Sequence, residues 1–98
     1  MRDLNVEKTC NILNQVLQYE LAGVVRYTHY SLMVSGPHRI PIVEFMKEQA
    51  TESLQHAQQA GEIITGLGGH PDQGIAPIEE THKHDIYTLL SESLSHER

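Results

Sequence analysis

The chain has 98 residues, enough for one small domain, and carries a formal net charge of −6. A domain of this size buries only about two thirds of its unfolded surface, so we expect a partner chain to add to its stability. The negative charge and the lack of any basic run disfavour nucleic-acid binding, and four tyrosines, one phenylalanine and no tryptophan favour helices over a sheet. We therefore expect an all-α chain.

The first predicted element is a long helix that begins near residues 4–5 and ends at Ser35-Gly36-Pro37. Gly36 can adopt the left-handed conformation that closes a helix, and Pro37 cannot continue one. Alternating steps of four and three, typical of the face that one helix packs against another, run through Val6, Cys10, Leu13, Leu17, Glu20, Val24, Tyr27, Ser31 and Val34. A carboxylate, Glu20, thus occupies a position where a leucine is expected.

The second predicted helix begins around Pro41 and ends at Gly66 or Leu67, before the stop signal Gly68-Gly69-His70-Pro71. Two long helices joined by a few residues must lie antiparallel. The same steps of three and four run through Ile42, Phe45, Gln49, Glu52, His56, Ala60, Ile63 and Leu67. A second carboxylate and an imidazole therefore share the face predicted to meet the first helix.

A polar connection then leads through Pro77 to a third predicted helix that Thr81 can cap. Its apolar series, Ile86, Leu89, Leu90 and Leu94, leads to Glu97 and meets no stop signal. We expect residues 1–98 to form a single domain that is incomplete at its C-terminus and is completed by a fourth helix or by a partner subunit.

Glu20, Glu52 and His56 would be costly to bury without partners. A metal ion between the helices would satisfy all three, and carboxylate oxygen with imidazole nitrogen suits iron, manganese or zinc. Two other interpretations stay open: Glu20 could pair with Arg26 of another subunit, and Glu52 with His56 could form a surface pair. Tyr27 is either a core aromatic or a residue that orients a ligand or supplies an electron.

Several segments resemble the ferritin-like superfamily, most closely bacterioferritin, over the whole chain: Tyr19-Glu20-Leu21, Tyr27, Glu52-Ser53-Leu54-Gln55-His56-Ala57 and Gly66-Leu67-Gly68-Gly69-His70-Pro71. The resemblance implies a four-helix bundle that holds a di-iron centre. It assigns Glu20 as the ligand from the first helix, His56 as the imidazole from the second, and Glu97 as the carboxylate from the third. No segment corresponds to the fourth helix.

Two positions depart from the bacterioferritin pattern. Ser53 stands three residues before His56, where the family carries its second-helix glutamate, and Glu52 stands four residues before it. Four residues still place Glu52 and His56 on one helix face, so Glu52 remains a candidate ligand. Leu54 occupies the place of the family's haem-ligating methionine, so we expect no haem, and we interpret Met33 and Met46 as core residues.

The resemblance implies an iron-binding ferroxidase that oxidises Fe(II) to Fe(III) with dioxygen or peroxide, for iron storage or detoxification. The alternative is a non-catalytic structural subunit of a ferritin-like shell, which Ser53 and the missing fourth helix favour. A rubrerythrin-like peroxide scavenger is weaker, because the chain has no Cys-x-x-Cys iron domain. We expect a homo-oligomer, with a large shell as one form of it.

The single cysteine, Cys10, cannot form an internal disulfide, and we interpret it as a small core residue. The sequence shows neither a signal peptide nor an apolar run long enough to cross a membrane. The default expectation is a cytoplasmic protein without a membrane partner.

Overall fold

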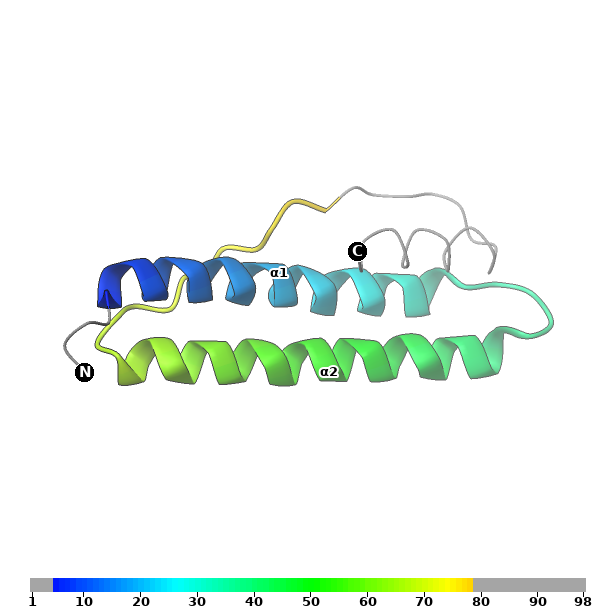
Figure 1. Ribbon diagram of the computed structural model, residues 1–98. Coiled ribbons are helices and arrows are strands. Elements are labelled where there is room, and N and C mark those ends of the chain that lie inside the picture. The colour runs from blue at the N-terminus through cyan, green and yellow to red at the C-terminus, as the bar shows by residue number, and fades with distance from the viewer. Residues whose placement is uncertain (1–4, 79–98) are drawn as a thin grey trace.

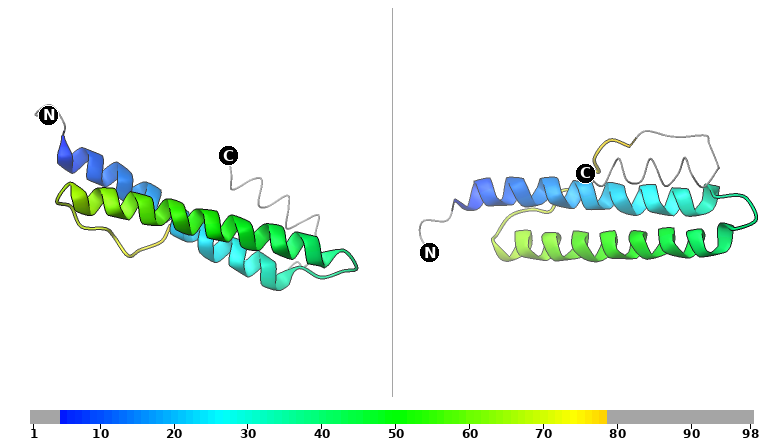
Figure 2. Two further views of the ribbon diagram at one scale, coloured as in Figure 1. Left: turned by 90° about the horizontal axis from the view of Figure 1, so that it is seen from below. Right: turned by 45° about the vertical axis from the view of Figure 1, so that its right-hand side comes forward.

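Two long helices dominate the computed structural model, which describes residues 5–78. Helix α1 spans Val6–Met33 and helix α2 spans Arg39–Gly66. The two helices lie side by side and antiparallel along their whole length, as the views from three sides show (Figures 1 and 2). Residues 5–78 contain no β-strand, so the predicted all-α hairpin is confirmed.

Polar capping and a glycine turn set the limits of α1. The side chain of Asn5 accepts a hydrogen bond from the backbone N–H of Lys8 at 3.0 Å, which satisfies one of the free donors of the first turn. At the other end the N–H of Val34 donates to the carbonyl of Tyr30 at 3.1 Å. Gly36 follows with φ of 116°, so the chain reverses where the sequence predicted.

Helix α2 begins at Arg39, two residues before the predicted start at Pro41. Pro41 is therefore the third residue of the helix, within the first turn, where a backbone N–H would have no partner inside the helix. The Nε of Arg39 donates to the carbonyl of Val34 at 3.1 Å, which ties the start of α2 to the end of α1. The hairpin connection is thus held by its own hydrogen bonds.

A glycine closes α2. Gly68 has φ of 86°, its N–H donates to the carbonyl of Thr65, and the N–H of Gly69 donates to the carbonyl of Ile64. These two bonds are the Schellman arrangement, in which the residue with positive φ is usually glycine. The predicted stop at Gly68 is confirmed.

The helices pack through two separate apolar clusters. The cluster near the hairpin connection contains Tyr27, Tyr30, Met33, Val34, Met46 and Ala50. The cluster at the other end contains Cys10, Leu17, Ala57, Ala60 and Ile64. The interpretation of Cys10, Met33 and Met46 as core residues is confirmed, and the core is interrupted between the two clusters.

The face of α2 that meets α1 differs from the predicted one. Met46 is fully buried, whereas the predicted Phe45 is 43% exposed and Ile63 is 52% exposed. The buried series is Met46, Ala50, Ser53, Ala57, Ala60 and Ile64. Because one residue turns a helix by about 100°, a shift of one position turns a different series of side chains toward α1. The series that packs against α1 is rich in alanine, whose small side chain lets the two helices approach closely.

The segment after α2 turns back along α1 without forming a helix or strand up to residue 78 (Figure 1). The N–H of Asp72 donates to Oδ1 of Asn14 at 2.8 Å, and Nε2 of Gln18 donates to Oδ2 of Asp72 at 2.6 Å. The N–H of Ala76 donates to the carbonyl of Gln18 at 3.1 Å. This connection is therefore a packed loop, as predicted. The predicted third helix, with Thr81 and Glu97, lies outside the described residues.

Neither α1 nor α2 is long and apolar enough to cross a lipid bilayer.

Candidate metal centre

Polar side chains fill the gap between the two apolar clusters. They line a hollow of about 130 Å³ that is largely enclosed by the two helices. Helix α1 contributes Tyr19, Glu20, Gly23 and Arg26, and α2 contributes Gln49, Glu52, Ser53 and His56. All three residues that the sequence marked as candidate ligands in the first two helices line this hollow.

Glu20 and His56 face each other across the helix pair. Oε2 of Glu20 lies 3.5 Å from Nδ1 of His56. The Glu20 side chain is 19% exposed and that of His56 is 53% exposed, so the pair sits at the open side of the hollow. The two groups form an ion pair when the imidazole is protonated, and both atoms are of types that bind transition metals.

Glu52 lines the same hollow and is exposed. Within residues 5–78, however, no three His, Cys, Asp or Glu side chains are grouped so that they could hold a metal ion. The described part of the chain therefore offers a close pair, Glu20 with His56, and a third carboxylate nearby. The role of Glu20, Glu52 and His56 as ligands stays a prediction, and Glu97 lies outside the described residues.

The helices approach each other closely where Gly23 faces Ser53. A Cβ atom built on Gly23 would lie 2.8 Å from Oγ of Ser53 and 3.3 Å from its Cβ, closer than side chains tolerate. Ser53 is buried in this contact. A glutamate at position 53 would need space that α1 occupies. The close approach of the helices therefore depends on a small side chain at this position.

Arg26 is a buried cation in the same hollow. Its side chain is 4% exposed, and its Nε atom is buried without a hydrogen-bond partner. Its Cζ lies 5.2 Å from the centroid of the Tyr27 ring and 6.0 Å from that of Tyr19, within the range of cation–π attraction. Within residues 5–78 no carboxylate forms an ion pair with it. The predicted Glu20–Arg26 pair is therefore not made inside the described part of one chain, and pairing across subunits stays a prediction.

The sequence named Arg26 only as a possible ion-pair partner of Glu20 across subunits, and it did not predict that Arg26 is buried between the helices. Arg26 precedes Tyr27 of the predicted packing face, and Gly23 lies one turn before Tyr27. Two features of the sequence lie in this region: an arginine next to an apolar series, and a glycine inside a helix. The arginine is usually interpreted as exposed to solvent, and the glycine as a position that weakens the helix.

Tyr27 lies in the core cluster near the hairpin connection and is almost fully buried. Its ring packs edge-on against Tyr30, with 6.4 Å between the ring centroids and 83° between the ring planes. The interpretation as a core aromatic is confirmed. Because the same ring also contacts Arg26, a role in orienting groups of the hollow stays a prediction.

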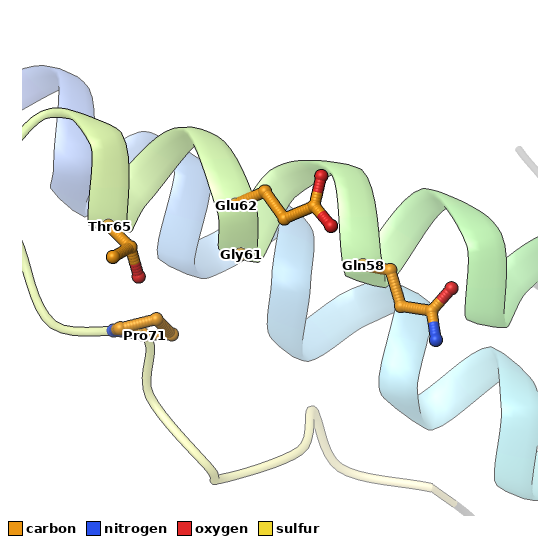
Figure 3. Close-up of a pocket in the computed structure, with 5 residues that line it drawn as sticks. All are labelled: Gln58, Gly61, Glu62, Thr65 and Pro71. Atoms are coloured by element: carbon orange, nitrogen blue, oxygen red, sulfur yellow. The ribbon is translucent and has the colours of Figure 1, made fainter.

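A second hollow lies beside the other half of α2. It measures about 410 Å³ and is formed where Pro71 of the following segment faces Thr65, next to Gln58, Gly61 and Glu62 (Figure 3). Glu62 is its single ionisable side chain. This hollow is larger than the one around Glu20, but its lining has no imidazole and no second carboxylate.

Comparison with known proteins supports the fold and the family. Residues 10–98 match the family model described as "Ferritin-like domain". The chain is similar to a solved structure from Bacillus anthracis described as "ferritin like, diiron-carboxylate proteins", with 25% sequence identity and a TM-score of 0.85. The match covers 94% of this chain and 65% of that one, so the chain spans just under two thirds of the relative's length. No curated protein matches the sequence.

Proposed function

The chain belongs to the ferritin-like domain family, and from this premise we propose that it binds iron(II) in the hollow lined by Glu20, Glu52 and His56. We further propose that the assembled bundle oxidises this iron(II) to iron(III) with dioxygen or peroxide, for iron storage or detoxification. The observation that carries the proposal is the 3.5 Å approach of Glu20 to His56 between α1 and α2. The similar structure described as a diiron-carboxylate protein supports the choice of iron.

The donor set suits iron. Carboxylate oxygens favour the ferric over the ferrous state, and the imidazole nitrogen binds both. Bound iron supplies the electrons that reduce the oxidant. The chain's own residues hold the substrate: Glu20 and His56 bring their donor atoms together, and iron must displace any proton that they share. Glu52 adds a carboxylate at the open side of the hollow.

One helix hairpin is half of such a site. A di-iron bundle of this kind uses about four carboxylates and two imidazoles, whereas the hairpin offers Glu20, Glu52 and His56. Two chains related by a two-fold axis would supply the full number. The other route, which we favour, uses Glu97 and a fourth helix, as the resemblance to bacterioferritin implies. Both routes need helices packed onto the exposed side of the hollow.

The alternative function is a structural subunit of a ferritin-like shell that does not oxidise iron. Two features of the hollow favour it. Ser53 stands where the resemblance places a glutamate, and the buried Arg26 adds a positive charge that opposes a second metal ion. Under this alternative the Glu20–His56 pair is a polar contact between helices.

Anaerobic titration with iron(II), followed by addition of dioxygen or peroxide, separates the two functions. We expect the chain to bind iron(II), and we expect Glu20→Gln combined with His56→Asn to abolish binding. Glu44→Gln is the matched control, because Glu44 is an exposed carboxylate of α2 outside the hollow. Binding that survives the double substitution contradicts the proposed site, and iron(II) that stays unoxidised after the oxidant is added favours the structural subunit.

A further inference from the structure

We propose that Arg26 anchors a small inorganic oxyanion, phosphate or bicarbonate, beside the metal ion in the hollow between α1 and α2. The inference rests on the proposed metal binding by Glu20 and His56. It adds a second ligand to the site and assigns it to a residue that neither the sequence pattern nor the comparisons connect with chemistry.

The state of Arg26 is the first argument. An arginine that is 96% buried normally forms an ion pair or several hydrogen bonds, because an unpaired buried charge is costly. Here Nε has no partner, and within residues 5–78 no carboxylate pairs with the guanidinium. The rings of Tyr19 and Tyr27 attract the cation but accept no strong hydrogen bond in its plane. The buried Nε–H of Arg26 therefore lacks a hydrogen-bond acceptor that an oxyanion would supply.

The surroundings of Arg26 are the second argument. Ser53 and Gln49 line the same hollow and carry a hydroxyl and an amide that can donate to oxygen. The hollow measures about 130 Å³, whereas one water needs about 10–15 Å³ by the same measure. There is room for a small anion but not for a nucleotide. The planar guanidinium fork suits phosphate and carboxylate-like groups, which it binds through two parallel hydrogen bonds.

Charge explains why the anion and the metal must bind together. Glu20 and Glu52 line the hollow with Arg26, so an anion alone meets two carboxylates. A metal ion held by Glu20 and His56 removes this repulsion and offers the anion a second positive partner. By thermodynamic linkage the anion must then raise the affinity for the metal by the same factor.

Manganese(II) tests this linkage without redox chemistry, because it accepts the same oxygen and nitrogen donors. The electron paramagnetic resonance signal of free manganese(II) gives its affinity for the 98-residue chain in chloride, phosphate and bicarbonate at equal ionic strength. We expect phosphate or bicarbonate to raise the affinity at least tenfold over chloride, and the separate buffers identify which anion acts.

Variants of Arg26 decide whether this residue is responsible. We expect Arg26→Gln to abolish the anion effect and Arg26→Lys to keep part of it, because lysine retains the charge without the fork. Arg39→Gln is the control, because Arg39 is exposed and lies outside the hollow, and it should keep the full effect. Circular dichroism confirms that each variant stays helical, and Arg26→Lys carries the test if Arg26→Gln does not fold.

Three results overturn the inference: the first two remove only the oxyanion site, and the third also removes the metal site. Manganese binding that is equal in all three anions, or an anion effect that survives Arg26→Gln, removes the oxyanion site but leaves the proposed metal site intact. No manganese binding by the unchanged chain in any anion removes both.

Discussion

Glu20 and His56, thirty-six residues apart in the sequence, bring Oε2 and Nδ1 to 3.5 Å across the gap between two apolar clusters. The apolar clusters on either side of the pair hold the two helices in register, so the packing of the helices brings these two side chains together. Such an arrangement is typical of a site whose geometry is set by its scaffold.

The first prediction separates the binding role of this pair from its contribution to stability. His56 is half exposed, so the pair should stabilise the metal-free chain by no more than about 1 kcal/mol. We expect Glu20→Gln and His56→Asn each to change the free energy of unfolding in urea by less than this amount. Each should lower the affinity for manganese(II) or iron(II) at least tenfold. A large loss of stability without loss of metal affinity would assign the pair to the fold alone.

The second prediction concerns the close approach of Gly23 to Ser53. Gly23→Ala would place a methyl group 2.8 Å from Oγ of Ser53. Overpacking of this kind typically costs about 1–3 kcal/mol, more than the gain of up to about 1 kcal/mol from replacing a helical glycine by alanine. We expect a net loss of stability in thermal or urea unfolding, partly restored by adding Ser53→Ala.

Gly61 provides the matched control. It lies inside α2, and a Cβ there meets no atom within 4 Å. Gly61→Ala should therefore stabilise the chain by about 0.5–1 kcal/mol. If Gly23→Ala stabilises the chain as much as Gly61→Ala does, the helices are further apart at Ser53 than the structure shows.

The limits of the helices could be predicted from the sequence because strong local signals set them. Gly36, Gly68 and the capping residue Asn5 act through their own backbone or a neighbouring N–H, and such effects do not depend on the rest of the fold. The start of α2 shifted by two residues because Pro41 fits several positions of a first turn.

The face of α2 could not be predicted, for a physical reason. The hydropathy pattern predicts that Phe45 and Ile63 lie on the buried face of α2. The face that meets α1 is instead lined largely by alanine and serine. Close packing rewards small side chains, and their hydropathy signal is weak. The burial of Arg26 was not predicted for a related reason: charged residues are usually exposed, and the contact of Arg26 with the rings of Tyr19 and Tyr27 leaves no hydropathy signal.

The third prediction tests which face α1 covers. Met46 is fully buried, while its neighbour Phe45 is 43% exposed. Met46→Ala should cost about 2–5 kcal/mol, as is typical for a buried methionine. In monomeric protein, Phe45→Ala should cost clearly less despite removing more atoms. If Phe45→Ala lowers the free energy of unfolding in urea more than Met46→Ala does, α1 packs against the face of α2 that the sequence pattern predicted.

The last prediction links metal binding to association. Phe45 and Ile63 flank Glu52 and His56 along one exposed face of α2, and large apolar side chains in such a row favour contact with another helix. A helix that covers this face also reaches the open side of the hollow, where the missing donors are needed. We expect sedimentation to show an oligomer at micromolar concentration, and Phe45→Ser with Ile63→Ser to shift it toward the monomer.

The affinity for the metal should fall when the oligomer dissociates. If a second chain completes the site, dilution below the dissociation range must weaken the binding of manganese(II), because a ligand that prefers the oligomer stabilises it by mass action. The double serine variant should show weak binding at every concentration, although Glu20, Glu52 and His56 are unchanged in it. Leu32→Ser serves as the control, because Leu32 is exposed on α1 outside the hollow. Tight binding by a monomer would show that one chain holds the metal without help from a second.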